Sequence, residues 1–223
     1  MALRQVALPT RLIQIRKHDL AIALQKVNPH PKPAVALEQY TIPADLAAEI
    51  LFTACYAHDD IQGKRVLDLG TGTGRLALGA SVLGARTIVG VDIDTSSIRV
   101  ASQSAKFLHA RVSWVVADIG TIRGPFDTVV MNPPFGTKQP HTDLQFLQCA
   151  QNLATVIYSI HKSSTRNFLE QWLQNQALKG ERIMSTKMEI PHQFSFHRKP
   201  KRFVEVDVFR ILRTYRQFEP VLI

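Results

Sequence analysis

The strongest constraint on the fold is an alternation of two kinds of segment between residues 64 and 212. Short apolar, β-branched runs typical of buried strands are followed by longer segments with helical periodicity. The predicted strands are residues 64–70, 87–93, 112–117, 126–132, 154–160, 182–190 and 204–212. The predicted helices are residues 75–83, 95–110, 142–152 and 164–178, with Thr95 or Ser96 capping the second and Gly180 stopping the last. This alternation predicts an α/β fold with a doubly wound, mostly parallel, seven-stranded Rossmann-like sheet.

The two ends of the chain depart from this alternation. No helix is predicted between the last two strands, so we expect an antiparallel C-terminal hairpin at one edge of the sheet. Helical patterns also cover residues 10–27 and 43–58, and the proline-rich stretch 28–33 between them cannot be helical. The 223 residues fit one α/β domain with at most an added arm. We therefore expect a basic N-terminal helical arm over residues 1–33 and one domain over residues 34–223.

Composition excludes several classes of protein. Hydrophobic residues make up 45% and charged residues 20% of the chain, which excludes an intrinsically disordered protein. No apolar run reaches the roughly 18 residues of a membrane span, and the N-terminus resembles neither a signal nor a transit peptide. Two cysteines, Cys55 and Cys149, exclude a Cys-rich zinc site and a disulfide framework, and we predict no metal site. Low cysteine content suits a reducing compartment, so we predict a cytoplasmic protein.

Positive charge is concentrated at the two ends of the chain. The net charge is +9, yet residues 39–160 hold 9 Lys and Arg against 10 Asp and Glu. Residues 161–216 hold 12 Lys and Arg against 5 Asp and Glu. This distribution is typical of a surface that binds phosphates, although a basic surface that only keeps the protein in solution would look the same.

A glycine-rich loop, residues 68–74 (DLGTGTG), stands between the first predicted strand and the next helix. Three glycines permit a tight turn and close approach to a ligand, and the helix start offers free backbone N–H groups. A phosphate-binding P-loop would need Gly-Lys-Ser/Thr, and a dinucleotide fingerprint would need glycine where Arg75 stands. The pattern therefore favours another nucleotide-type ligand at the carboxyl edge of the sheet. A tight turn with capping aspartates is the alternative.

Acidic residues at strand ends point to S-adenosylmethionine as that ligand. Asp92 ends the second strand, where a carboxylate can accept hydrogen bonds from both ribose hydroxyls. Asp118 ends the third strand and can accept from the adenine amine, while Ile119 packs against the ring. Asp68 would lie near the amino group of the cofactor. The cofactor-binding residues predicted for the loop and the strand ends are Asp68, Gly70, Thr71, Gly72, Thr73, Gly74, Asp92, Ile93, Asp118 and Ile119.

The fourth strand ends in the tetrad Asn132, Pro133, Pro134 and Phe135, which we predict to be catalytic. Two prolines stop strand pairing, so the segment leaves the sheet in a stiff, extended form. The Asn132 side-chain oxygen and the Pro133 carbonyl could hold both N–H bonds of an adenine amine, and Phe135 could stack on a flipped base. Positioning and aimed dipoles would supply most of the catalysis. A proline-rich turn that only caps the strand is the alternative.

These residues resemble the class I S-adenosylmethionine-dependent methyltransferases that methylate amines, and one family among them, methyltransferase-like protein five. The resemblance extends from about residue 34 to 212. It rests on residues 37–40 (LEQY), 132–138 (NPPFGTK), 158–166 (YSIHKSSTR) and 205–207 (EVD). It implies methylation of adenine N6 in small-subunit ribosomal RNA.

The same resemblance implies further contacts and a partner. Gln39, Tyr40 and Thr41 would touch the cofactor, with Thr41 taking the place of a family threonine that is Ile42 here. Thr71 and Thr73 stand where the family usually has cysteines. Eukaryotic members work with a small zinc-binding activator protein that covers an apolar sheet edge, so the resemblance makes such a protein a candidate partner, and the sequence leaves open whether this chain needs one.

Basic residues near the predicted site are the candidates for holding RNA. Lys162 and Arg166 could bind the phosphates that flank the target nucleotide. The basic run 197–202 lies near Phe194 and Phe196, a combination that suits single-stranded RNA. A helix-start loop and a solvated hairpin tip are the respective alternatives. The predicted RNA-binding residues are Lys138, His161, Lys162, Arg166, Arg198, Lys199, Lys201 and Arg202.

Three other functions stay open on the sequence alone. DNA adenine methylases often carry a separate sequence-reading domain, for which 223 residues leave little room. Protein glutamine methylases use a similar tetrad, although its final aromatic residue is usually tyrosine. The third is a cofactor-binding RNA assembly module without turnover.

Overall fold

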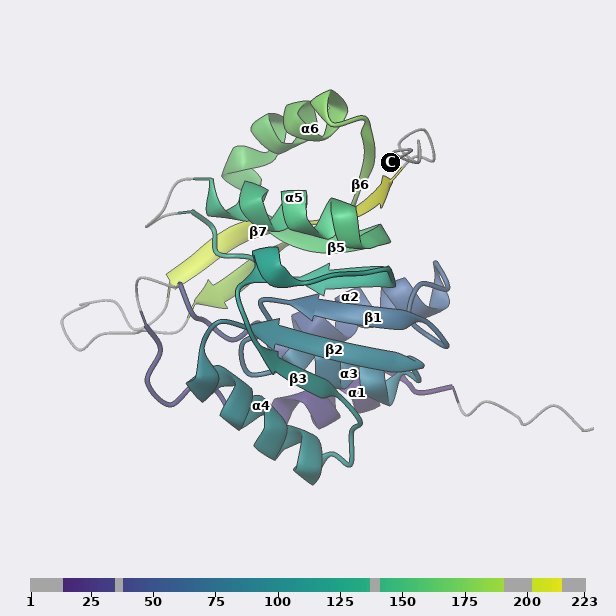
Figure 1. Cartoon of the computed structure of the whole chain (residues 1–223), viewed down its shortest axis with the longest axis vertical. Helices are drawn as coiled ribbons and strands as arrows, with labels where there is room; N and C mark the ends of the chain where they lie inside the picture. Colours follow the sequence, from purple (N-terminus) through teal and green to yellow (C-terminus); the bar gives the residue numbers. More distant parts are fainter. Residues whose placement is uncertain (1–13, 35–37, 137–140, 191–201, 214–223) are drawn as a thin grey trace, which may run out of the picture.

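A seven-stranded sheet forms the centre of the molecule, and helices cover both of its faces (Figure 1). The computed structural model describes residues 14–34, 38–136, 141–190 and 202–213. The strands in these ranges are β1 (Arg65–Leu69), β2 (Thr87–Asp92), β3 (Ser113–Val116), β4 (Phe126–Met131), β5 (Ala154–Lys162), β6 (Leu178–Ile190) and β7 (Arg202–Arg213). The helices are α1 (Lys17–Gln25), α2 (Ala44–Tyr56), α3 (Arg75–Val82), α4 (Thr95–Phe107), α5 (Thr142–Leu153) and α6 (Arg166–Asn175), with short 3-10 turns η2 (Ile119–Thr121) and η3 (Ser163–Thr165). None of the helices described is long and apolar enough to cross a membrane.

The strands lie in the order β3-β2-β1-β4-β5-β7-β6. Strands β1 to β5 run parallel, whereas β7 pairs antiparallel with both β5 and β6. The predicted fold class and the antiparallel pair at one edge are therefore confirmed. Winding reverses between β1 and β4, and a ligand crevice forms at the carboxyl ends of the strands beside such a reversal.

The hydrophobic core consists of two clusters, one on each face of the sheet. Leu24, Leu51 and Leu78, from α1, α2 and α3, belong to the first cluster, while α5 and α6 cover the second. Consecutive residues of a strand point to opposite faces, so Val66 joins the first cluster and Leu67 joins the second. Strand β1 is thus buried on both sides after Arg65, which explains why the rest of it is apolar apart from Asp68.

The N-terminal helix packs against the sheet domain. Helix α1 begins at Lys17, after an extended stretch at residues 14–16, so it starts later than the predicted residue 10. Its Leu20 and Leu24 side chains are fully buried in the cluster that α2 and α3 share. Residues 1–13 of the predicted arm lie outside the described ranges.

Two local predictions near α6 are wrong. The helix ends at Asn175 rather than at residue 178, and Gly180 lies inside β6 instead of stopping the helix. The chain reverses at Ala177, whose φ of 53° is in the left-handed region. Gly180 has a packing role, because a Cβ there would come within 2.6 Å of the Leu173 side chain.

Candidate active site

A cavity of about 220 Å³ opens at the carboxyl ends of β1, β2 and β4. The residues around it come from the glycine loop, the strand ends and the segment that precedes α2. Those predicted from sequence that line it are Gln39, Tyr40, Thr41, Asp68, Gly70, Thr71, Gly72, Thr73, Asp92, Ile93, Asp118, Ile119, Asn132 and Pro134. The structure therefore brings most of the predicted cofactor-binding residues together with part of the tetrad.

The glycine loop turns as predicted. Gly70, Gly72 and Gly74 have φ values of 72°, 54° and 87°, in the region that favours glycine. A Cβ on Gly70 would lie 2.6 Å from the Phe146 ring, whereas a Cβ on Gly72 would meet nothing within 4 Å. The backbone at Gly72 thus faces open space, and a ligand can approach it closely.

Asp68 fastens the loop to the start of α3. Its Oδ2 accepts hydrogen bonds from Thr71 Oγ1 at 2.6 Å and from the Ala77 backbone N–H at 2.8 Å. The side chain is 1% exposed, and this burial raises the pKa of Asp68 to about 7. A cationic group bound beside it would favour the ionised form.

Two carboxylates, one at the last residue of β2 and one just after it, have different environments. Asp92 accepts from the backbone N–H groups of Gly72 at 2.7 Å and of Asp94 at 2.9 Å, while burial raises its pKa. Asp94 accepts from the N–H groups of Ser96 and Ser97 and so caps α4, a role predicted wrongly for Thr95 or Ser96. Burial would raise the pKa of Asp94, but hydrogen bonds outweigh it and lower that pKa to about 2.

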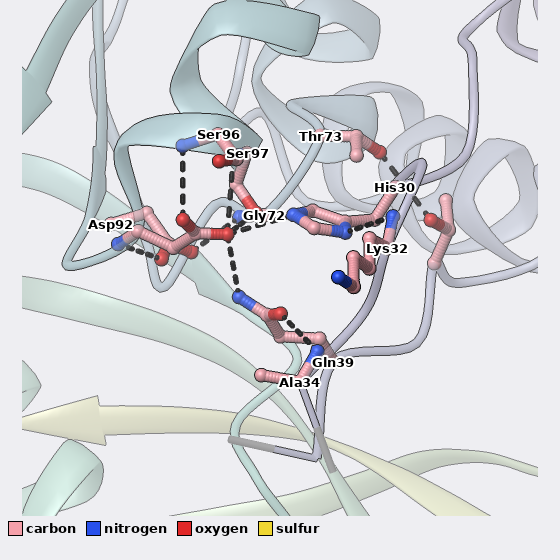
Figure 2. Close-up of polar contacts among 11 residues, drawn as sticks. His30, Lys32, Ala34, Gln39, Gly72, Thr73, Asp92, Ser96 and Ser97 are labelled. Carbon is pink, nitrogen blue, oxygen red and sulfur yellow. Dashed lines mark hydrogen bonds and ion pairs between the residues drawn. The ribbon is translucent and has the colours of Figure 1, made fainter. Parts of the chain in front are cut away.

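Two residues from the N-terminal region also bind Asp94 Oδ2 (Figure 2). Gln39 Nε2 donates to it at 2.9 Å, and His30 Nε2 lies 2.8 Å from it. Since His30 Nδ1 accepts from the Lys32 N–H at 3.0 Å, Nε2 is the ring nitrogen that can donate to Asp94. These contacts hold the proline-rich link against the β2 side of the cavity.

We call residues 38–42, between that link and α2, the strap. Glu38 Oε2 accepts from the Phe135 backbone N–H at 2.9 Å, and the Tyr40 and Phe135 ring centroids are 5.3 Å apart. Thr41 Oγ1 lies 3.4 Å from Thr73 Oγ1, at the glycine loop. The strap therefore contacts the tetrad and the cofactor loop at the same time.

The tetrad follows β4 directly, as predicted. Asn132 Oδ1 is buried and has no hydrogen-bond partner among the described residues. Phe135 is 9% exposed, because Tyr40 packs against it and Lys162 Nζ lies 5.6 Å from its ring centroid. The asparagine is thus an open acceptor beside the cavity, whereas a base could stack on Phe135 only at the small part of the ring left uncovered.

Two of the predicted RNA-binding side chains make internal contacts instead. Arg166 donates twice to Asp207, from Nε at 2.7 Å and from the terminal guanidinium nitrogen at 2.9 Å. His161 is 1% exposed, lies 2.7 Å from Ser159 Oγ and 3.5 Å from the Asp143 carboxylate. Burial keeps His161 from an RNA phosphate in this structure, whereas the Arg166 side chain is one-third exposed but has two of its N–H groups engaged by Asp207.

The other RNA-binding candidates have different placements. Lys162 is half-buried at the end of β5, beside Phe135. Arg202 begins β7, and nothing is described of its side chain. Lys138, Arg198, Lys199 and Lys201 lie outside the described residues.

Several residues that line the cavity were not predicted from the sequence. Glu38 stands within the LEQY stretch that supports the family resemblance, so its position could have been noticed there. His30 lies between two prolines, and a polar residue is common in such a linking segment, so nothing in the sequence marks it as part of a site. Arg75 donates to the backbone carbonyl of Ile42 and to that of Val27, the latter at 2.9 Å. No pattern in the sequence around Arg75 indicates these distant partners.

The residues present fit S-adenosylmethionine. Gly72, Asp92, Ile93 and Phe146 all line the cavity, so the open backbone at Gly72 could approach the cofactor, Asp92 could accept hydrogen bonds from its ribose hydroxyls, and Ile93 and Phe146 could provide apolar contacts. The open acceptor of Asn132 borders the same cavity, so a methyl donor and an amine acceptor would meet at one edge of the sheet. A seven-stranded sheet with this strand order, a glycine loop after its first strand and a cavity at its carboxyl edge is typical of the class I S-adenosylmethionine-dependent methyltransferases, and the protein is one of them.

Comparison with known proteins narrows the class. The rRNA N(6)-adenosine-methyltransferase METTL5 of Danio rerio is 37% identical over 88% of this chain and 98% of that protein. The Drosophila melanogaster Mettl5 protein is 33% identical over 89% of this chain and 97% of that protein. A crystal structure of a candidate RNA methyltransferase from Pyrococcus horikoshii matches with a TM-score of 0.83 and 38% identity, over 91% of this chain and 100% of that one. The family Ribosomal protein L11 methyltransferase (PrmA) matches residues 53–133. The chain belongs to the METTL5 family of rRNA N(6)-adenosine-methyltransferases.

Proposed function

We propose that this protein transfers the methyl group of S-adenosylmethionine to the N6 amine of an adenosine in small-subunit ribosomal RNA. The single observation that carries the proposal is the Asn132 side-chain oxygen, a buried acceptor without a partner among the described residues, at the rim of the cofactor cavity. A buried unsatisfied acceptor costs free energy, so its retention supports a ligand that donates a hydrogen bond there. The names of the Danio and Drosophila relatives support adenosine N6 in ribosomal RNA as that donor.

The proposed chemistry depends on holding the amine. The lone pair of adenine N6 is delocalised into the ring, so the amine is a poor nucleophile. Accepting its two N–H bonds at Asn132 Oδ1 and the Pro133 carbonyl would fix the nitrogen and localise its lone pair. Bound S-adenosylmethionine supplies an electrophilic methyl group on a sulfonium. Orientation and electrostatic preorganisation would therefore provide most of the rate enhancement.

The RNA surface in this proposal begins at Lys162. Its ammonium group lies at the Phe135 ring, so it is placed to hold a phosphate next to a base bound at the tetrad. Lys138 and the run 197–202 are proposed to extend this surface, on the strength of their charge alone. The internal contacts of His161 and Arg166 support leaving those two residues out of the RNA surface.

Protein methylation is the alternative that has some support. The match to the family Ribosomal protein L11 methyltransferase (PrmA) ends at Pro133, inside the tetrad. The matched residues include the cofactor loop and strands β1 to β4, which methyltransferases with different substrates have in common. Strands β5 to β7 lie outside the match. The METTL5 relatives match across both parts of the chain, so ribosomal RNA is the better-supported substrate.

The activator protein and the cytoplasmic location stay predictions. Strand β3 is the edge strand opposite β6, and its Val115 and Val116 side chains are exposed. Edge strands with exposed apolar side chains can be covered by a partner, which supports the expected activator. Gel filtration of the protein mixed with a candidate activator would test this expectation.

A substrate competition experiment tests the proposed function. The protein is incubated with methyl-labelled S-adenosylmethionine and, in parallel, small-subunit RNA, large-subunit RNA, intact small subunits, DNA and ribosomal proteins. We expect label in small-subunit RNA, either naked or in the subunit. Label only in large-subunit RNA would correct the substrate, whereas label only in protein or DNA would contradict the proposal.

A further inference from the structure

The strap and the tetrad are joined by a contact that lies beside the proposed chemistry. Glu38 Oε2 accepts the Phe135 backbone N–H at 2.9 Å, across 97 residues of sequence. Glu38 also lines the cavity, although it does not belong to the glycine loop or to a strand end. The contact needs only an acceptor oxygen at this distance, which either a carboxylate or a side-chain amide of the same length can supply.

The composition of the tetrad explains why this contact matters. Prolines have no backbone N–H, so Pro133 and Pro134 cannot be anchored by donating a hydrogen bond. Phe135 offers the first backbone N–H after Asn132, and Glu38 accepts it. One carboxylate therefore anchors the far end of the segment whose near end leaves β4.

The rest of the strap holds Glu38 in place from both sides. Tyr40 packs against the Phe135 ring, while Gln39 donates to Asp94 at the start of α4. Glu38 itself has a φ of 48°, in the left-handed region that residues with side chains rarely adopt. Such a conformation persists only where the surrounding contacts fix it, and these contacts aim the carboxylate at the tetrad.

We propose that Glu38 is a positioning residue for methyl transfer, which holds the Phe135 amide and thereby fixes the Pro133 carbonyl and the Phe135 ring relative to the bound cofactor. This inference rests on the proposed function, since it assigns Glu38 a part in orienting the adenine amine. Glu38 acts through the tetrad and accepts no proton from the substrate. Its reach therefore matters more than its charge.

Three substitutions separate reach from charge. Glu38→Gln keeps the length and an acceptor oxygen, Glu38→Asp keeps the charge but shortens the side chain, and Glu38→Ala removes both. Glu49→Ala is the matched control, because Glu49 is a surface glutamate of α2 that pairs with Lys17 away from the cavity. Each variant is measured for kcat, KM for cofactor, KM for RNA and thermal midpoint.

We expect kcat to fall about 10- to 100-fold in Glu38→Ala and Glu38→Asp, the scale of a 1 Å misplacement. Glu38→Gln should stay within about fivefold of the wild type, and KM for cofactor should change less than about threefold throughout. Glu49→Ala should match the wild type. A Glu38→Gln variant as inactive as Glu38→Ala would overturn the inference, because charge would then matter more than reach.

Two further outcomes would also overturn it. Equal kcat values in all folded variants would leave Glu38 with no part in transfer, while the proposed function would stand. A fall in thermal midpoint with unchanged kcat per folded enzyme would make the contact structural only. If Glu38→Ala does not fold, the comparison of Glu38→Asp with Glu38→Gln decides alone. A wild type that labels no RNA in the same reactions would overturn the proposed function and this inference with it.

Discussion

The cofactor side and the target side of the cavity differ in how their polar groups are satisfied. On the cofactor side, Asp68, Asp92 and Asp94 each accept at least two hydrogen bonds from the protein. On the target side, Asn132 Oδ1 is buried with no hydrogen-bond partner among the described residues. The same holds for the hydroxyl of Tyr40, a predicted cofactor-binding residue whose ring packs against Phe135 of the tetrad. Burial also raises the pKa of the Tyr40 hydroxyl well above its usual value.

This difference separates two tasks. The protein itself organises the cofactor side, so the loop geometry is complete before any ligand arrives. On the target side, Asn132 Oδ1 has no hydrogen-bond partner among the described residues. We interpret the target side as completed only when a substrate that donates a hydrogen bond to this oxygen is bound. Substitutions on the two sides should consequently affect different kinetic constants.

The largest effect is expected on the target side, from Asn132→Ala. Loss of the amide oxygen removes an acceptor that the adenine amine would use, so kcat should fall about 100- to 1,000-fold. The dissociation constant for S-adenosylhomocysteine, measured by calorimetry, should change less than about threefold. Asn152→Ala, on the outer part of α5, is the matched control. Near-normal turnover in Asn132→Ala would break the distinction between the two sides.

The opposite pattern is expected from Gly70→Ala. Its Cβ would come within 2.6 Å of Phe146, at a φ of 72° that already disfavours a side chain. Cofactor affinity should fall about tenfold or more, while kcat at saturating cofactor should recover. Gly63→Ala is the control for strain, because Gly63 has a φ of 71° but nothing within 4 Å of the added Cβ. An equal loss of affinity in both variants would show that strain, and not the loop, is responsible.

The pH dependence of cofactor binding sharpens the role of Asp68. The pKa of Asp68 is raised to about 7, and the positively charged amino group of the cofactor should bind better to the ionised carboxylate of Asp68 than to the neutral carboxyl. Affinity should therefore fall about tenfold for each pH unit below 7 and level off above about 8. Because the pKa is raised on folding, this group stabilises the fold less as the pH rises from about 4 to 7. Calorimetric titrations from pH 5.5 to 8.5 should show this slope in the wild type, and a slope that persists in Asp68→Asn would assign it to another group.

The smallest effect is expected from Lys162→Ala. Loss of one phosphate contact should weaken RNA binding and reduce the slope of log affinity against log salt by about 1. Lys179→Ala is the matched control, since Lys179 pairs with Leu212 near the opposite end of the sheet. A filter-binding series over salt measures both variants, and equal slopes would remove Lys162 from the RNA surface. The cofactor constants should not change in either variant.

Local patterns predicted the fold well because buried parallel strands are written as continuous apolar runs. Strands β1, β2 and β4 lie within one or two residues of their predicted bounds, and the glycine loop turns as expected. The start of β6 was missed, because Gly180 resembles a helix stop and its packing against Leu173 depends on tertiary structure. Gly180 also pairs with Ile211 on β7, 31 residues further along the chain, and no local pattern shows that pairing.

The same limit applies to the site. Strand ends predicted the positions of Asp92 and Asn132, since parallel strands bring their carboxyl ends to one edge. The pairing of Arg166 with Asp207 could not be predicted from the local sequence, because Asp207 lies 41 residues away on strand β7. The contact of Glu38 with Phe135 was missed for the same reason.

In the proposed function, the open acceptor of Asn132 selects the N6 amine of an adenosine. The most direct measurement is mass spectrometry of nucleosides from small-subunit RNA treated with the wild-type protein or with Asn132→Ala. We expect N6-methyladenosine with the wild type and none above background with Asn132→Ala. Methylation of a different nucleoside, or equal N6-methyladenosine with both proteins, would contradict it.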